Sequence, residues 1–216
     1  MRTAIQQSLK ELEELLLTMS GEVVRAVHRS IDALKAKDLE EAEAIRRDDE
    51  KINRMRWKIE EKAIKLMATQ QPVATDLREL IALLNMITDL ERMGDYAAGI
   101  AKIVLKSGNE NHVKPLIDIP RMADLSVEMI ERSITAWIER DVEEARQIHR
   151  DDDQVDELYH QVIRELVSIM IEDPSKITRC THLIWIAHNL ERIADRCTNI
   201  CERIIFLVTG KMMEEI

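Results

Sequence analysis

The 216-residue sequence predicts an all-α protein: two tandem, pseudo-symmetric three-helix bundles made of six long helices. Three observations support this prediction. The chain has 5 glycines, 4 prolines and 1 phenylalanine, while Leu, Ile, Ala, Met, Glu, Lys and Arg are abundant, a composition typical of helices. Apolar residues recur at spacings of three and four over long segments, as on one helix face. The second half of the chain repeats the plan of the first.

The first half contains three predicted helices. One runs from about residue 3 to residue 36. The next begins after Asp38, which forms a capping box with Glu41, and it ends before Pro72. A third runs from about residue 74 to residue 106. Because the connections are short, these helices are expected to pack as antiparallel neighbours in one bundle.

A segment rich in polar residues and proline then separates the halves, and we expect residues 108–118 to be a linker. Three further helices follow, at about residues 119–140, 141–172 and 175–209. The predicted domains are therefore residues 1–107 and residues 119–216, each a three-helix repeat.

The alignment of the two repeats is visible in the spacing of matching residues. Asp38 recurs as Asp141, 103 residues later, and Glu91 recurs as Glu191, 100 residues later. The difference of three residues falls near the turn between the second and third helices, where changes of length cost little. A repeat of this size indicates an internal duplication and not a solenoid of many small units.

Composition also restricts the function and the compartment. A formal net charge of −10 argues against a nucleic-acid partner, which would require a basic surface. No apolar run approaches the roughly 20 residues that span a bilayer, so no transmembrane segment is expected. The N-terminal residues lack the apolar core of a signal peptide. Three cysteines, two of them one helical turn apart, are too few for a disulfide framework, so the expected compartment is the reducing cytoplasm.

A pair of carboxylates recurs at the same place in both repeats. Residues 89–95 are Asp-Leu-Glu-Arg-Met-Gly-Asp, and residues 189–195 are Asn-Leu-Glu-Arg-Ile-Ala-Asp. The matching pairs are Glu91 with Asp95 and Glu191 with Asp195. Their spacing places both carboxylates of a pair on one helix face, where like charges repel by roughly 0.2–0.5 kcal/mol. A cation between them would turn this repulsion into attraction.

The second helix of each repeat adds more oxygen-bearing side chains. These are Asp49 and Asn53 in the first repeat, and Asp152 and Asp156 in the second. The apolar stripes place the carboxylate pairs on the far side of each helix, so we expect them to face away from the bundle core. Carboxylate and amide oxygens suit Mg²⁺, Mn²⁺, Ca²⁺ or iron, with Zn²⁺ also possible. The alternative interpretation is an ordinary solvated acidic face.

Other polar and sulfur-bearing residues have simpler interpretations. Asp48 and Asp151 fall within apolar stripes, so we expect each to be hydrated or paired with an arginine. Five residues are expected in the core: Cys197, Cys201, Trp57, Trp137 and Trp185. The sequence contains no Gly-rich phosphate loop, Walker lysine motif or nucleophile elbow, so no catalytic apparatus is expected.

These motifs together resemble those of the PhoU family of bacterial phosphate-transport regulators. The resemblance rests on Asp-Glu-Leu-Tyr, Ile-Glu-Asp-Pro, Asn-Leu-Glu-Arg-Ile-Ala-Asp-Arg-Cys-Thr-Asn-Ile and Leu-Val-Thr-Gly within residues 155–210, and extends over nearly the whole chain. It implies a cytoplasmic protein, usually a homodimer. It also implies action with the phosphate-specific ABC transporter ATPase and a sensor histidine kinase, as a negative regulator of phosphate uptake and starvation signalling.

The resemblance further implies multinuclear iron or zinc clusters on the Glu/Asp-x-x-x-Asp motifs, with Mg or Mn also possible. Carried over to this chain, the metal candidates are Asp49, Asn53, Glu91, Asp95, Asp152, Asp156, Glu191 and Asp195. The chain departs from the family pattern at Asn53, which replaces a carboxylate, at Arg196, which is often histidine, and at His188, which is often arginine. The first-repeat site is therefore expected to be the weaker one.

The predicted function is a non-enzymatic adaptor between transporter and kinase. The alternative is a carboxylate-bridged metal enzyme on a helical bundle. Ferritin-like enzymes use Glu-x-x-His motifs that point into the bundle core, and no such motif occurs here. A third interpretation is a structural scaffold without a site, in which Glu91 and Glu191 would tolerate alanine.

Overall fold

The structure is a computed structural model that describes the backbone of residues 2–211 and the side chains of residues 5–211. Over this range the chain forms six long α-helices and one short 3₁₀ turn, Pro174–Lys176. The helices are α1 (Arg2–Ala36), α2 (Leu39–Gln70), α3 (Thr75–Ser107), α4 (Asp118–Glu139), α5 (Val142–Glu172) and α6 (Ile177–Thr209). The predicted all-α fold is confirmed, and α4 begins one residue before its predicted start.

The second helix of each repeat begins in the same way. The Asp38 side chain accepts a hydrogen bond from the backbone N–H of Glu41 at 2.9 Å, as the capping box predicts. Asp141 does the same for the backbone N–H of Glu144 at 3.0 Å. In both repeats the preceding turn thus ends on an aspartate that satisfies one of the free N–H groups of the helix.

The last helix begins later than expected. Residues 174–176 form a 3₁₀ turn because the Asp173 side chain accepts hydrogen bonds from the N–H and the hydroxyl of Ser175. The helix then ends where predicted, at Gly210, whose φ of 75° lies in the left-handed region that glycine adopts without strain.

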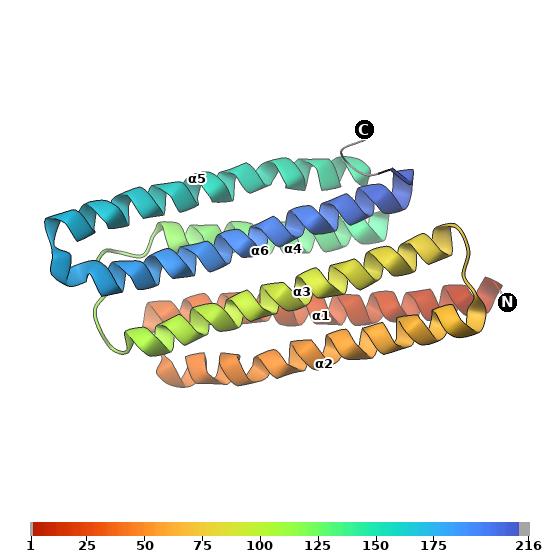
Figure 1. The fold of residues 1–216 in the computed structure, drawn as a ribbon, viewed down its shortest axis with the longest axis horizontal. Helices are drawn as coiled ribbons and strands as arrows, with labels where there is room; N and C mark the ends of the chain where they lie inside the picture. The colour runs from red at the N-terminus through yellow and green to blue at the C-terminus, as the bar shows by residue number, and fades with distance from the viewer. Residues whose placement is uncertain (1, 212–216) are drawn as a thin grey trace.

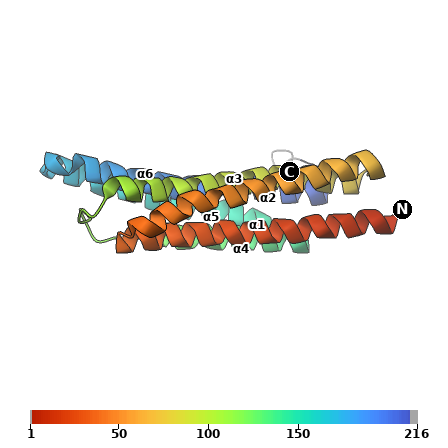
Figure 2. The same cartoon turned by 90° about the horizontal axis from the view of Figure 1, so that it is seen from below.

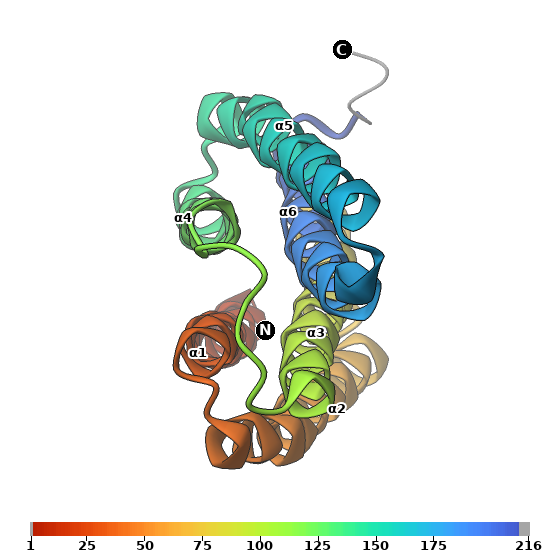
Figure 3. The same ribbon diagram turned by 90° about the vertical axis from the view of Figure 1, so that its left-hand side faces the viewer.

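The two repeats lie side by side with their long axes aligned (Figure 1). The end view in Figure 3 shows a curved layer of four helices in the order α2, α3, α6, α5, and a second layer of α1 and α4. Figure 2 shows the same two layers from the side. The repeats join where α3 contacts α6 and α1 contacts α4.

One continuous apolar core runs through both repeats. The predicted stripe residues are buried, and so are the three cysteines, which are free thiols. Burial raises the pKa of Cys201 to about 12, so this thiol is unreactive at neutral pH. No helix within residues 2–211 has the length and apolar character needed to cross a bilayer.

The tryptophan prediction is correct for one residue and wrong for two. Trp137 is fully buried, and the Arg140 guanidinium lies 4.6 Å from the centre of its ring. Trp57 and Trp185 are instead 57% and 55% exposed. They lie on the solvent-facing sides of α2 and α6, away from the buried stripes, although Ile184 and Ile186 flank Trp185 in sequence.

Candidate functional site

The first acidic patch consists of Asp49 and Asn53 on α2 and Glu91 and Asp95 on α3. The Asn53 amide donates to Asp49 Oδ2 at 3.4 Å, and Arg56 Nη1 donates to Glu91 Oε1 at 3.1 Å. The other oxygen of Asp49, Oδ1, is buried and has no hydrogen-bond partner among the described residues. The helices α2 and α3 thus bring together the four side chains that the sequence selects in this repeat.

The carboxylates of the first patch act on one another electrostatically. Burial, followed by repulsion from Asp95 and Glu91, raises the pKa of Asp49 to about 6. Burial and the Glu91 charge also raise the pKa of Asp95, whereas Arg92 and Arg56 oppose that increase. Negative charge therefore accumulates here beyond what the neighbouring arginines neutralise.

The second acidic patch consists of Asp152 and Asp156 on α5 and Glu191 and Asp195 on α6. Arg192 donates from Nε and Nη2 to the two oxygens of Glu191, each at 2.6 Å. Its Nη1 also lies 3.5 Å from Asp195 Oδ2. This bidentate pairing neutralises one carboxylate and leaves the two on α5 without a cationic partner at hydrogen-bond distance among the described residues.

The pKa of the corresponding aspartate is raised further in the second patch than in the first. Burial, followed by repulsion from Asp156, Asp195 and Glu191, raises the pKa of Asp152 to about 7. Burial and Glu191 raise the pKa of Asp156 as well. As in the first repeat, Oδ1 of the leading aspartate is buried without a hydrogen-bond partner among the described residues.

The predicted orientation of the patches is wrong in part. Glu191 is only 9% exposed, although the sequence predicts that its side chain faces away from the core, and Asp49 and Asp152 on the covering helices are partly buried as well. The reason is that α2 covers the side of α3 that carries Glu91, and α5 covers the matching side of α6. The patches therefore lie in the grooves between paired helices and not on a fully solvated face.

The predicted site does not include the aromatic and imidazole groups that lie beside the second patch. His188 Nδ1 lies 3.8 Å from Glu191 Oε2. Around His188, the rings of Trp185 and Tyr159 have centroids 5.6 and 6.1 Å away, and Tyr159 also lies 5.8 Å from His160. Aligning the two repeats would have revealed these histidines as specific to the second repeat, because the first repeat has Trp57 and Thr88 at the positions of His160 and His188.

The prediction of arginine-paired aspartates is confirmed in both repeats. Arg29 donates to Glu41 at 2.5 Å and to Asp48 at 2.7 Å, linking α1 to α2. The second ion triad, with distances of 2.6 and 2.7 Å, is Arg132, Glu144 and Asp151. These aspartates belong to structural ion triads and not to the acidic patches.

A polar seam between α3 and α6 separates the two patches. Asp89 on α3, which is 9% exposed, accepts hydrogen bonds from Asn199 at 3.2 Å and Arg196 at 3.5 Å, both on α6. The pseudo-symmetric contact is between Asn189 and Gly99, where an added Cβ would lie 3.4 Å from the Asn189 amide. Each patch therefore lies within one repeat, between its second and third helices.

The side chains of the patches suit a cation chemically, but they do not form a closed site as placed. Within the part of the chain that the structure describes, no three His, Cys, Asp or Glu side chains converge closely enough to enclose a metal ion. Arginines contact Glu91 and Glu191 instead. The unpartnered oxygens of Asp49 and Asp152 are the groups that a cation would satisfy.

Comparison with known proteins identifies the family. The model of the PhoU domain matches twice, at residues 16–104 and 119–204. A phosphate-specific transport system accessory protein PhoU homolog from Clostridium acetobutylicum is 38% identical over 214 residues, covering 99% of this chain and 98% of that protein. A homolog of the same name from Aquifex aeolicus is 36% identical, covering 96% of this chain and 94% of that protein.

Two solved structures have the same fold. The crystal structure of PhoU from Pseudomonas aeruginosa matches with a TM-score of 0.91 at 32% identity, covering 95% of this chain and 99% of that one. The phosphate transport system regulatory protein PhoU from Streptococcus pneumoniae matches with a TM-score of 0.90 at 33% identity, covering 97% and 99%. Sequence and structure agree over both repeats, and the chain belongs to the PhoU family.

Proposed function

We propose that this chain is a regulatory accessory protein of phosphate transport and acts as a non-enzymatic adaptor. Its partners would be the ATPase of the phosphate-specific ABC transporter and a sensor histidine kinase, on the cytoplasmic side of the membrane. In this role it restrains phosphate uptake and the starvation response when phosphate is plentiful. The observation that carries the proposal is the match to PhoU proteins over both repeats and nearly the full length of the chain.

The acidic patches are the proposed contact surfaces. The chain has a net charge of −10, and each patch places carboxylates in a groove between two helices. Exposed Trp185 stands beside the second patch and offers an aromatic ring to a cationic side chain. Such a surface favours partners with basic segments and speeds their association. We propose a homodimer as the functional form.

A bound cation would use the same residues. The donors are three carboxylates and one amide in the first patch and four carboxylates in the second, and each patch contains a buried, unpartnered aspartate oxygen. Iron or zinc, or Mg or Mn, would supply positive charge that removes the repulsion among these carboxylates. The second patch is the stronger candidate because it has four carboxylates and nearby imidazole, whereas Asn53 replaces a carboxylate in the first.

Co-purification with the two partners tests the adaptor proposal. The tagged transporter ATPase and the tagged kinase are each used as bait at high and at low phosphate, with wild-type chain and with a Glu91→Gln, Glu191→Gln variant. We expect wild type to be retained by both baits and the double variant to be retained more weakly. A Glu14→Gln, Glu61→Gln variant is the control, since it removes the same charge outside the patches. Failure of wild type to bind either bait would overturn the proposal.

A further inference from the structure

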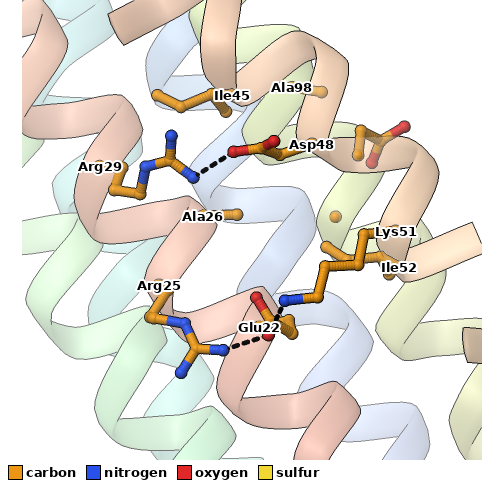
Figure 4. Close-up of a pocket in the computed structure, with 11 residues that line it drawn as sticks. Glu22, Arg25, Ala26, Arg29, Ile45, Asp48, Lys51, Ile52 and Ala98 are labelled. Atoms are coloured by element: carbon orange, nitrogen blue, oxygen red, sulfur yellow. Dashed lines mark hydrogen bonds and ion pairs between the residues drawn. The ribbon is translucent and has the colours of Figure 1, made fainter.

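The first repeat contains a cavity of about 170 Å³ between α1 and α2, close to the middle of α3 (Figure 4). Its apolar wall includes Ile45 and Ile52 of α2 and the small residues Gly94 and Ala98 of α3. Six charged side chains also line it: Glu22, Arg25, Arg29, Asp48, Asp49 and Lys51. The cavity is therefore apolar on one side and rich in ionic groups on the other.

Small residues make room for this cavity, and the repeat alignment shows larger ones at the matching positions. Ala26 corresponds to Met129, which is buried in the core of the second repeat. Gly94 corresponds to Ala194, and Ala98 corresponds to Thr198. Each of these three differences makes the side chain of the second repeat larger, although Ile52 is matched by the smaller Val155, so the sequence of the first repeat favours open space here.

The positive charges show the same asymmetry. Arg25 corresponds to Glu128, and Lys51 corresponds to Gln154. Only Arg29 has a cationic counterpart in the second repeat. The first repeat thus has two more cations than the second among the residues that line this space.

These cations keep donors free for a ligand. Glu22 contacts both Arg25 and Lys51 and holds them together at one end of the cavity. Figure 4 shows Arg29 on the other side of Ala26, where its Nη1 donates to Asp48 at 2.7 Å. An arginine carries five N–H donors and a lysine carries three, so these ion pairs leave N–H groups that an anion could accept from.

We infer that this cavity binds a small tetrahedral oxyanion, with inorganic phosphate as its ligand. Three cationic side chains, each paired with a carboxylate, and three carboxylates line the space, so an anion would bind through the N–H groups that these ion pairs leave free. The volume is well below the roughly 300–1,000 Å³ of sites for drug-sized ligands, so a single phosphate group fits and a nucleotide does not. Arginine and lysine are the side chains that proteins use for phosphate oxygens. The inference rests on the proposed function, because it makes phosphate itself the signal that the adaptor reads.

Titration calorimetry of the full chain with potassium phosphate, at constant ionic strength in sodium chloride, tests this site. We expect saturable binding of one phosphate per chain. Lys51→Gln copies the second repeat and should weaken binding about tenfold, since it removes one charge-assisted contact. Ala26→Met fills the cavity and should abolish binding. Lys62→Gln is the matched control, because it removes another exposed lysine of α2 that is paired with a carboxylate, and it should bind as wild type does.

Circular dichroism melting of each variant shows whether the fold is retained, and the surface variant Lys51→Gln keeps the test decisive even if Ala26→Met unfolds. Absence of saturable binding by wild type would overturn the site, as would wild-type affinity in Lys51→Gln. Co-purification with the transporter ATPase and the kinase is a separate experiment, and its variants do not alter this cavity. A negative result here therefore removes the phosphate site and leaves the adaptor proposal to its own experiment.

Discussion

The two repeats share a backbone plan and a structural ion triad, but their functional surfaces differ. In the first repeat, three carboxylates and the Asn53 amide form the patch, and a cavity lined by three cations and three carboxylates lies nearby. In the second, four carboxylates form the patch, and His188 lies beside Glu191. The ion triads that link the first and second helices are thus the same in both repeats, whereas the residues of the proposed sites differ.

The packing between second and third helices shows how such divergence is compensated. In the first repeat, Ile52 lies against Gly94, where an added Cβ would be 2.9 Å from Ile52 Cδ1. In the second repeat the corresponding pair is Val155 and Ala194, in which one side chain is smaller and the other larger. The pair thus keeps its total number of side-chain carbons while the individual residues change.

The largest expected difference concerns the ion triads. The Asp151 side chain is 17% exposed, whereas its counterpart Asp48 is 58% exposed. Arg132→Ala leaves a mostly buried carboxylate unpaired and should lower the free energy of unfolding by about 2 kcal/mol. Arg29→Ala should cost about 0.5–1 kcal/mol, because water solvates its partner. Urea denaturation measures the free energy of unfolding of both variants. Equal losses of this free energy would show that the burial of the aspartate does not set the cost of removing its arginine.

The next difference concerns pH. The pKa of Asp152 is about 7 in the folded protein, well above its ordinary value, so the folded state holds a proton that the unfolded chain has lost. Stability therefore falls as pH rises from about 4 to about 7. Asp152→Asn removes this loss and should stabilise the protein above pH 7 by about 1–2 kcal/mol, allowing for solvent screening at a half-buried group.

Thermal melting in a chelating buffer from pH 4 to pH 8 checks this expectation, with Asp49→Asn as the comparison. The gain from Asp49→Asn should be smaller and should be complete at a lower pH, because the pKa of Asp49 is about 6. A destabilised Asp152→Asn protein at pH 8 would mean that the charged carboxylate stabilises the metal-free fold.

The smallest expected effect on stability comes from replacing a packing contact of the first repeat by the corresponding residues of the second. Gly94→Ala brings a methyl group against Ile52, and the gain in helix propensity offsets part of the steric cost. Adding Ile52→Val copies the second repeat and should make the double variant about 1 kcal/mol more stable than additivity of the two single variants predicts. A double-mutant cycle by urea denaturation gives this coupling, and strict additivity would refute compensation.

Much of this molecule follows from its sequence. Apolar periodicity and capping aspartates predict the helices, because each depends on residues within a few turns. Matched spacing between repeats places Glu91 near Asp49 and Glu191 near Asp152, since a duplicated bundle puts equivalent helices together. The sequence also predicts that Asp48 and Asp151 are hydrated or paired with an arginine, and each is paired, although Asp48 remains largely exposed.

The remainder depends on how helices cover one another. The burial of Glu191 depends on which face of α5 lies against α6. The exposure of Trp57 and Trp185 likewise depends on which faces of α2 and α6 the neighbouring helices leave uncovered. His160 and His188 come from different helices, so no single motif contains both. The cavity beside Ala26 becomes visible only when small residues from α1 and α3 are placed against the same part of α2.

We propose that the two repeats have diverged in function and that the second patch is the stronger cation site. Elemental analysis of protein purified without a metal-affinity tag tests it most directly, with wild type, Glu91→Gln and Glu191→Gln compared. We predict stoichiometric iron or zinc in wild type, loss of most of it in Glu191→Gln, and retention of most of it in Glu91→Gln. A metal-free wild type, or equal loss in the two variants, would contradict the claim.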